Sequence, residues 1–236
     1  MNKMSNIALI IAGGVGRRFH NLIPKQFITV FDKPVIIYTL ECFQKHPSID
    51  EICVVCLNDW INFLEVYSSQ FHISKLKHIV KGGENGQESI RMGLNCLKHF
   101  YDLDDIVLIH DAIRPNVSSD IISNCINCVK NKGSVVTAIP CNEAMMISSN
   151  DVFSDKAYPR NQLKRTQTPQ GAHLGDLIKL HEYAEEHSIR NSVATCTLMT
   201  ECGRRIFFSP GSSKNIKITT PEDLDIFKSL IKTENL

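Results

Sequence analysis

The chain has 236 residues, of which 43% are hydrophobic and 22% charged, and its formal net charge is +1. This length and composition suit one globular domain with a full core and exclude an intrinsically disordered chain. A net charge this close to zero argues against broad binding to nucleic acid or to an anionic membrane, and no apolar run approaches the roughly 18 residues that span a bilayer. We therefore expect one domain over residues 1–236, located in the cytoplasm, with no secretory leader.

Apolar runs and amphipathic segments alternate from the start of the chain. The expected strands are Ile7–Ala12, Ile52–Leu57, His78–Val80, Ile106–His110 and Ser134–Ile139. The expected helices are Pro34–Lys45, Asp59–Gln70, Glu88–Phe100 and Asp120–Lys130. This β-α-β alternation predicts an α/β fold, in which a mostly parallel sheet carries helices on both faces.

A polar stretch from about Pro140 to Thr166 breaks this alternation. It contains no convincing helix and only short strand signals. A stretch of this length that adds nothing to the main sheet is commonly functional or an interaction arm, so we expect an arm over residues 140–166. The elements expected after it are helices at Leu174–Glu186 and Thr195–Cys202, strands at Arg205–Phe208 and Asn215–Thr219, and a last helix that Thr220 caps.

Nine cysteines include two pairs with CxxC spacing. In the strand Ile52–Leu57, a spacing of three residues sends Cys53 and Cys56 to opposite faces, which is poor geometry for one zinc ion. Cys125 and Cys128 lie on a predicted helix and lack a second nearby pair of ligands. We therefore expect reduced thiols buried as small apolar groups, and neither a zinc site nor a disulfide scaffold.

A glycine-rich loop with basic residues follows the first strand. It reads AGGVGRR over residues 12–18, and PKQ at residues 24–26 closes it. Glycines let the backbone approach a ligand and present N–H groups to phosphate, and ligands of open parallel sheets lie beyond the carboxyl ends of the strands. With Arg18 and Lys25 on either side, the loop predicts a triphosphate cradle, although such a turn can also be purely structural. It matches neither G-x-G-x-x-G nor a Walker A loop.

Further polar motifs follow other predicted strands. Asp111 ends a buried strand in HDAIRP, where a carboxylate facing a phosphate site is well placed to hold Mg²⁺ directly or through water. Capping a helix is the structural alternative for this aspartate. Lys217 lies in NIKIT, and a single lysine in a strand is by itself more often solvated than catalytic.

The motifs AGGVGRRF, PKQF, GGENGQESI, HDAIRP, TQTPQ and NIKITTPEDL resemble, in this order and over nearly the whole chain, one cytidylyltransferase family. That family includes the methylerythritol-phosphate and ribitol-5-phosphate cytidylyltransferases. The resemblance implies a Rossmann-like sheet, CTP bound in the first loop, magnesium on the triphosphate, and a homodimer in which the arm of one subunit reaches its neighbour. The reaction it implies is transfer of CMP from CTP to a polyol phosphate, with release of pyrophosphate.

The resemblance also assigns roles position by position. It implies catalytic cations at Arg18, Lys25 and Lys217, CTP-binding residues at Ala12, Gly13, Gly14, Gly83, Glu84 and Ser89, acceptor-binding residues at Arg114, Arg160 and Thr168, and a metal-side residue at Asp111 that in the family can instead contact sugar hydroxyls. Fixed cations suit this chemistry because attack on the α-phosphorus builds charge on its equatorial oxygens and on the departing pyrophosphate. A bridging lysine also lowers the repulsion between two approaching phosphates.

Three positions bear on the acceptor. Gly86-Gln87 resembles the ribitol-phosphate branch, whereas methylerythritol enzymes usually carry Arg-Ala there. Ala144 replaces a usual threonine and Val193-Ala194 a usual Thr-Asp pair, so polar groups are lost on the acceptor side only. The alternatives are the methylerythritol phosphate enzyme of isoprenoid synthesis and, from another class, a dinucleotide-binding oxidoreductase or a non-catalytic nucleotide-binding module. The last class requires a G-x-G-x-x-G turn, which is absent.

Overall fold

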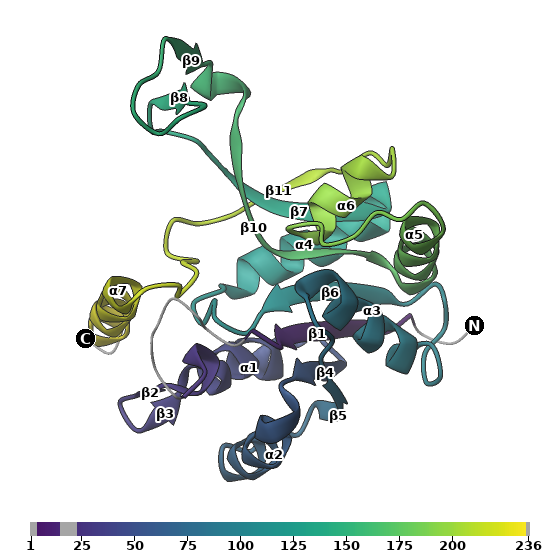
Figure 1. Cartoon of the computed structure of the whole chain (residues 1–236). Coiled ribbons are helices and arrows are strands. Elements are labelled where there is room, and N and C mark those ends of the chain that lie inside the picture. The colour runs from purple at the N-terminus through teal and green to yellow at the C-terminus, as the bar shows by residue number, and fades with distance from the viewer. Residues whose placement is uncertain (1–3, 15–22, 235–236) are drawn as a thin grey trace.

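Seven strands form one central sheet in the computed structural model, which describes residues 4–14 and 23–234. Their order is β11-β7-β10-β6-β1-β4-β5 (Figure 1). The strands are β1 (Asn6–Ala12), β4 (Glu51–Cys56), β5 (Leu76–Lys81), β6 (Ile106–Asp111), β7 (Ser134–Pro140), β10 (Lys164–His173) and β11 (Phe208–Pro210). Only β10 runs antiparallel to its neighbours, so the predicted, mostly parallel sheet is confirmed.

Helices cover both faces of the sheet. One apolar cluster joins it to α1 (Val35–Lys45), α2 (Ile61–Gln70) and α4 (Ser119–Lys132), and a second joins it to α3 (Gly86–Leu97), α5 (Leu174–Glu186) and α6 (Thr195–Glu201). Cys56 belongs to the first cluster and Cys53 to the second, which confirms that their spacing sends them to opposite faces. All nine cysteines carry free thiols.

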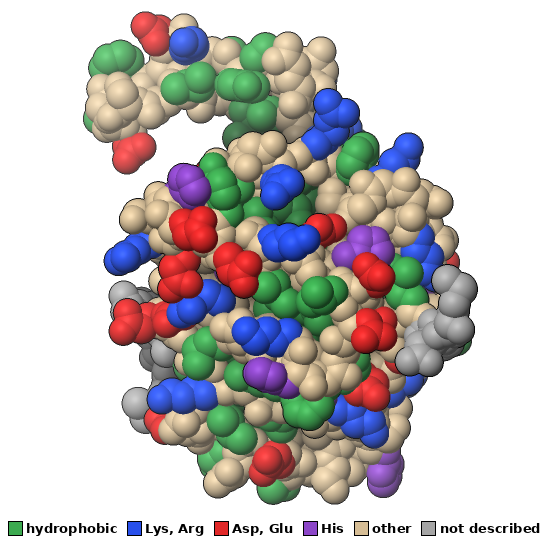
Figure 2. Space-filling view, turned by 90° about the vertical axis from the view of Figure 1, so that its right-hand side faces the viewer, with side chains coloured by type: hydrophobic (Ala, Val, Ile, Leu, Met, Phe, Trp, Pro, Cys, Tyr) green, Lys and Arg blue, Asp and Glu red, His purple; other side chains and the backbone are tan. Residues whose placement is uncertain are grey.

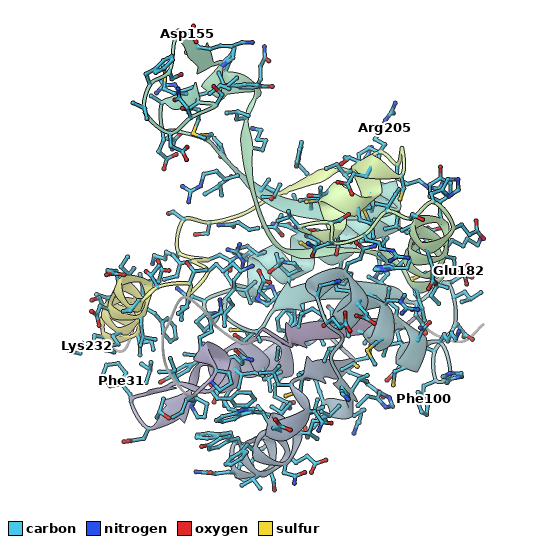
Figure 3. All side chains as sticks on the ribbon, in the orientation of Figure 1. Phe31, Phe100, Asp155, Glu182, Arg205 and Lys232 are labelled. Atoms are coloured by element: carbon cyan, nitrogen blue, oxygen red, sulfur yellow. The ribbon has the colours of Figure 1, made fainter. Side chains whose placement is uncertain are left out.

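The predicted arm is a hairpin that projects from the body (Figure 1). Strands β8 (Met145–Ile147) and β9 (Lys156–Tyr158) pair antiparallel in a sheet of their own, and Asp155 marks its tip in Figure 3. The expectation that residues 140–166 add nothing to the main sheet is wrong at both ends, because Pro140 at the end of β7 pairs with Lys164 at the start of β10.

Strand β10 was not predicted, because its sequence reads as a polar loop containing a proline. Pro169 lies where the pairing with β7 shifts register, between Thr166 and Gln170, and such an irregularity tolerates a residue without an N–H group. The strand predicted at Arg205–Phe208 begins only at Phe208.

The strand predicted at Asn215–Thr219 is also wrong. This segment lies outside the sheet, and its backbone makes a hydrogen bond from Ile218 N to Ile113 O of 2.9 Å and a turn bond from Asn215 N to Ser212 O of 3.1 Å. Its apolar residue Ile218 instead packs in a third cluster with Phe227 of α7 (Pro221–Glu234). The alternation of apolar and polar residues therefore reflects packing under a helix.

The start of the last helix agrees with the prediction. The Asp223 carboxylate accepts hydrogen bonds from the backbone N–H groups of Thr219 and Thr220 at 2.8 and 2.9 Å, and the Thr220 hydroxyl accepts one from Asp223 N at 3.4 Å. These reciprocal bonds satisfy donors at the helix start. Among the described residues, no helix is both long and apolar enough to cross a bilayer.

The segment after the glycine-rich loop holds three short elements that the sequence did not indicate. They are the 3₁₀ helix η2 (Lys25–Phe27) and the hairpin strands β2 (Thr29–Val30) and β3 (Lys33–Pro34). A further 3₁₀ turn, η3 (Asn58–Trp60), leads into α2. Stacking of Phe27 on Trp60, with ring centroids 4.5 Å apart, ties η2 to η3.

Candidate active site

The loops after β1 and β5 meet at the carboxyl edge of the sheet. A side chain at Gly13 would place its Cβ 3.1 Å from the Ser89 hydroxyl oxygen, so the loop backbone and Ser89 are in close contact. The same hydroxyl accepts a hydrogen bond from Gly83 N at 3.1 Å. The packing therefore leaves little room for a side chain at position 13, and predicted nucleotide residues from both loops converge.

Gln26 holds the glycine-rich loop in place. Its amide Nε2 is buried and donates to Ala12 O at 2.6 Å and to Gly14 O at 3.0 Å, one on each side of Gly13. This fixes η2, and with it the half-buried Lys25, beside the loop. No sequence pattern indicated this role beyond the position of Gln26 next to Lys25. The predicted cation Arg18 lies outside the described residues.

Glu84 lies at the exposed start of α3. Its backbone N–H donates to the Glu88 carboxylate at 2.8 Å, and Asn85 caps the helix by accepting from Glu88 N at 2.9 Å. These bonds fix the turn that joins Gly83 to Ser89. The Glu84 side chain itself is exposed beside this turn.

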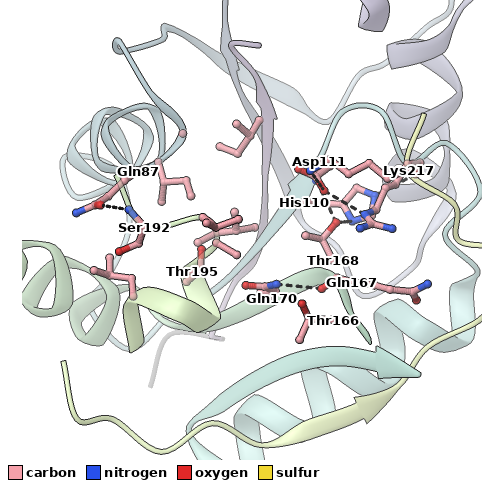
Figure 4. Close-up of a pocket in the computed structure, with 18 of the residues that line it drawn as sticks. Gln87, His110, Asp111, Thr166, Gln167, Thr168, Gln170, Ser192, Thr195 and Lys217 are labelled. Carbon is pink, nitrogen blue, oxygen red and sulfur yellow. Dashed lines mark hydrogen bonds and ion pairs between the residues drawn. The ribbon is translucent and has the colours of Figure 1, made fainter. Parts of the chain in front are cut away.

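Two cations share one carboxylate at the end of β6. Asp111 Oδ2 lies 3.0 Å from Arg114 Nε and 3.1 Å from Lys217 Nζ (Figure 4). Burial alone would raise the pKa of Asp111, but attraction to Lys217 and then to Arg114 outweighs it and lowers this pKa below its ordinary value. Asp111 is thus ionised at neutral pH, and it holds together two cations that lie far apart in the sequence.

A hydrogen-bonded network supports this cluster from behind. The Arg114 guanidinium donates to Asn215 O at 2.8 Å, and the Asn215 amide donates to Thr168 O at 2.8 Å. The Thr168 hydroxyl lies 2.9 Å from His110 Nδ1. Burial lowers the pKa of His110 to about 4, so its ring is neutral at physiological pH. The segment around Asn215 is therefore held to β10 and to the loop after β6 by polar contacts.

His110 and Asn215 were not predicted as site residues. Their only signal in the sequence is that they stand inside the motifs HDAIRP and NIKIT, next to residues with assigned roles. Asn215 is fully buried in a polar network, and His110 is also fully buried. Both are needed to position neighbours, which a motif alone does not reveal.

A cavity of about 350 Å³ opens beside these groups. Figure 4 shows Asp111, Thr168 and Lys217 on one side of it and Gln87, Ser192 and Thr195 on the other. The cavity is therefore charged at one end and uncharged at the other.

Gln87 braces the uncharged side of this cavity. Its amide donates to Ile189 O at 2.8 Å and accepts from Ser192 N at 2.9 Å, which ties α3 to the loop before α6. That loop brings Val193 and Ala194 to the cavity wall. Two positions that depart from the expected family pattern thus line the same cavity as the predicted acceptor residues.

Arg160 lies apart from this cavity within one chain. It stands in the arm, in the 3₁₀ turn η4 (Arg160–Gln162), where its guanidinium is exposed and donates to Asn142 O at 3.2 Å. Ala144 is exposed on the arm as well. The cavity includes Arg114, Thr168 and Lys217 from the predicted set, and Arg160 is absent from its wall.

This chain is similar to known proteins over nearly its whole length. Residues 6–233 match the family described as 2-C-methyl-D-erythritol 4-phosphate cytidylyltransferase. A ribitol-5-phosphate cytidylyltransferase of Vibrio parahaemolyticus is 42% identical and covers 98% of both chains, and one of Lacticaseibacillus paracasei is 39% identical over 97% of this chain and 99% of its own. A 2-C-methyl-D-erythritol 4-phosphate cytidylyltransferase of Clostridium botulinum is 35% identical over 96% of this chain and 97% of its own.

Solved structures share the fold. The crystal structure of a 4-diphosphocytidyl-2C-methyl-D-erythritol synthase superposes with a TM-score of 0.81 at 23% identity, covering 98% of this chain and 100% of that one. The 2-C-methyl-D-erythritol 4-phosphate cytidylyltransferase of Francisella tularensis gives 0.78 at 26% identity, covering 95% and 99%. Ordered motifs, sheet topology and full-length relatives agree, and the chain belongs to this family of cytidylyltransferases.

Proposed function

We propose that this enzyme transfers CMP from CTP to a polyol phosphate, with ribitol 5-phosphate as the leading acceptor, and releases pyrophosphate. The observation that carries the proposal is the pair of cations, Arg114 and Lys217, held on Asp111 next to glycine-lined loops. The names of the relatives at 42% and 39% identity support ribitol 5-phosphate.

The reaction needs no general base. An oxygen of the acceptor phosphate is already an anion at neutral pH, so it attacks the α-phosphorus of CTP directly and forms a P–O–P bond. The bond from that phosphorus to the β-phosphate oxygen breaks, and pyrophosphate leaves with the electron pair. We assign Lys217 to the space between the two phosphates, Arg114 to the acceptor phosphate, and Lys25 with Arg18 to the triphosphate.

We propose Mg²⁺ as the metal that accompanies CTP, where it neutralises triphosphate charge. Among the described residues, no three His, Cys, Asp or Glu side chains lie close enough to cage an ion. A single carboxylate next to substrate phosphates is a common protein contribution to Mg²⁺ binding, and Asp111 fits that contribution. It would hold the ion directly or through water, while its Oδ2 keeps Arg114 and Lys217 in place.

A homodimer is proposed from the arm. Its hydrophobic side chains gather on the projecting part of the molecule in Figure 2, and Met146, Ile147, Val152 and Phe153 are all exposed there. Exposed apolar groups on a projecting hairpin favour contact with another chain. In such a dimer Arg160 would serve the acceptor site of the neighbouring subunit. The expected cytoplasmic location stays a prediction.

The methylerythritol phosphate reaction is the second candidate, because the matching family carries that description. A pyrophosphate-release assay with CTP and Mg²⁺ separates the two candidates when ribitol 5-phosphate, 2-C-methyl-D-erythritol 4-phosphate and glycerol 3-phosphate are compared as acceptors. We expect the highest kcat/KM with ribitol 5-phosphate, and far less pyrophosphate release when ATP replaces CTP. A higher kcat/KM with 2-C-methyl-D-erythritol 4-phosphate would make that compound the acceptor instead. Absence of pyrophosphate release with every polyol phosphate would contradict the proposed function.

A further inference from the structure

The Thr168 hydroxyl has two fixed neighbours at the edge of the cavity. Its oxygen lies 2.9 Å from His110 Nδ1 and accepts a hydrogen bond from the backbone N–H of Asp111 at 3.1 Å. The side chain is half-buried and lines the cavity on the same side as Lys217 (Figure 4). The position of every proton in this chain of contacts follows from its chemistry.

The tautomer of His110 is set by its second nitrogen. Nε2 lies 3.1 Å from the carbonyl oxygen of Arg114, and a carbonyl oxygen only accepts hydrogen bonds. Nε2 therefore carries the ring proton. Because His110 is completely buried, the neutral ring is favoured, and Nδ1 presents a lone pair.

The direction of the Thr168 bond follows. A hydroxyl has one proton and two lone pairs. Thr168 gives its proton to His110 Nδ1 and uses one lone pair for Asp111 N–H. Only one lone pair remains for a ligand in the cavity. A group that binds there must bring its own proton, and an ionised phosphate oxygen has none.

We propose that Thr168 selects a hydroxyl group of the acceptor as a hydrogen-bond donor, and that His110 is the positioning residue that sets this polarity. The inference rests on the proposed function, and it orients the acceptor within the cavity. The acceptor phosphate lies at Arg114 and Lys217, which bring positive charge and donors. A carbon-bound hydroxyl of the polyol lies at Thr168, which brings an acceptor.

Acceptor analogues test this directly. In a series of polyol phosphates, each hydroxyl in turn is replaced by fluorine, which accepts but cannot donate, or by an amino group, which can donate. We expect one position at which fluorine lowers kcat/KM about 10- to 100-fold while the amino group preserves it, with the CTP KM unchanged. Equal activity of all fluoro analogues would overturn the inference.

Variants locate the contact. Thr168→Val should abolish the difference between hydroxyl and fluorine at that position, and Thr168→Ser should restore it. Thr166→Val is the matched control, because Thr166 lies two positions away on the wall of the same cavity, and it should keep the difference. His110→Phe should shrink the difference although Thr168 is present. Retention of full discrimination in Thr168→Val would refute the assignment.

A measurement without turnover separates this inference from the proposed function. Nitrogen-15 NMR of the histidine rings in the free enzyme at pH 7 should show that His110 is protonated on Nε2 and unprotonated on Nδ1. The opposite tautomer would overturn the inference whatever the substrate is. If the tautomer is as expected but no polyol phosphate supports pyrophosphate release, the proposed function fails and the proton direction at Thr168 stands.

Discussion

At the scale of single residues, Asp111 holds the two cations of the cavity together. Its carboxylate faces Arg114, whose side chain is nearly buried, and Lys217, whose side chain is 42% exposed. The exposed partner contributes little to stability, since water screens such ion pairs, yet it is the cation that substrates can reach. Lys217 is therefore expected to matter for rate and hardly at all for folding.

Lys217→Ala should lower kcat/KM about 10²- to 10³-fold, because a positioned charge on the transition state is lost. Its unfolding midpoint in urea should stay close to wild type. Lys228→Ala is the matched control, since Lys228 pairs with Asp225 on the outer surface of α7 and should keep full activity. Steady-state kinetics of the two variants checks this, and near-normal turnover of Lys217→Ala would remove the residue from the mechanism.

Three buried histidines, His46, His110 and His181, have lowered pKa values, and the large shifts of the last two predict a pH dependence of stability. Burial lowers the pKa of His110 to about 4, and burial followed by repulsion from Arg91 lowers that of His181 to about 4. Unfolded histidine has a pKa near 6.5, so between about pH 4 and 6.5 the unfolded chain binds more protons than the folded one. The stability that the neutral buried rings contribute is complete above about pH 6.5 and is lost as the pH falls towards about 4.

His110 and His181 should each cost about 2 kcal/mol of unfolding free energy at pH 5 relative to pH 7.5, by this linkage. Urea titrations at both pH values measure the loss. His181→Phe should reduce the loss by about 2 kcal/mol, because one titrating ring is removed. Phenylalanine leaves no hydrogen bond broken, since both ring nitrogens of His181 lack hydrogen-bond partners among the described residues. His99→Phe, at an exposed position, should leave the loss unchanged. An unaltered pH dependence in His181→Phe would contradict the assignment.

At the scale of elements, β10 joins the sheet, the cavity and the arm. It pairs with β6 and β7, and Gly171 lets it approach β6, since a Cβ there would lie 2.3 Å from Val107 O. That contact is with backbone, which cannot move aside as a flexible side chain does. The close approach of two strands thus depends on one missing methyl group.

Gly171→Ala should lower the unfolding free energy by at least about 2 kcal/mol, because β10 must move away from β6 or strain its backbone. Gly86→Ala is the matched control. A Cβ at Gly86, in the first turn of α3, has nothing within 4 Å, so alanine should be neutral or slightly stabilising. Urea unfolding of both variants checks the contrast, and equal stability of the two would show that the strands can separate without cost.

The same strand shows what a sequence can and cannot predict. Buried parallel strands such as β1 and helices such as α5 are specified by their own apolar pattern. The strand predicted at Ile7–Ala12 starts one residue earlier, at Asn6, and α5 has the bounds that were predicted. Strand β10 is polar, with a proline at a register shift, and its pairing depends on neighbours far away in the sequence. The strand predicted at Asn215–Thr219 was wrong for the converse reason. Its alternating apolar pattern resembles that of a strand, but its apolar residue Ile218 packs under α7 and not in the sheet.

The residues of the candidate site also fall into those that motifs located and those that only the structure identified. The motifs located Asp111, Arg114, Thr168 and Lys217, which the fold brings to one cavity. Hydrogen bonds of Gln26, Gln87 and His110 depend on exact three-dimensional neighbours, so no local pattern marked them.

At the scale of the whole molecule, the arm projects from the body and exposes apolar side chains. Phe153 is 67% exposed on it, and Arg160 lies on it away from the cavity of its own chain. A hairpin that carries both exposed apolar groups and a predicted acceptor residue supports the proposed homodimer, in which another chain would cover it.

Phe153→Asp should shift the enzyme from dimer towards monomer in analytical ultracentrifugation, because a charge would be buried in the interface. Phe63→Asp on α2 is the matched control, since Phe63 is 52% exposed and lies outside the arm. Arg160→Ala should raise the KM for the acceptor more than that for CTP. A wild-type monomer, or a larger effect of Arg160→Ala on CTP, would contradict the role of the arm.

The continuity of β10 has a mechanical consequence. Its first residues form the base of the arm, and its middle residues, within the register shift between Thr166 and Gln170, form the wall that carries Thr168, so one strand joins the two regions. We expect that a partner chain which shifts the base of the arm also shifts Thr168, and that a ligand held at Thr168 shifts the base of the arm in return.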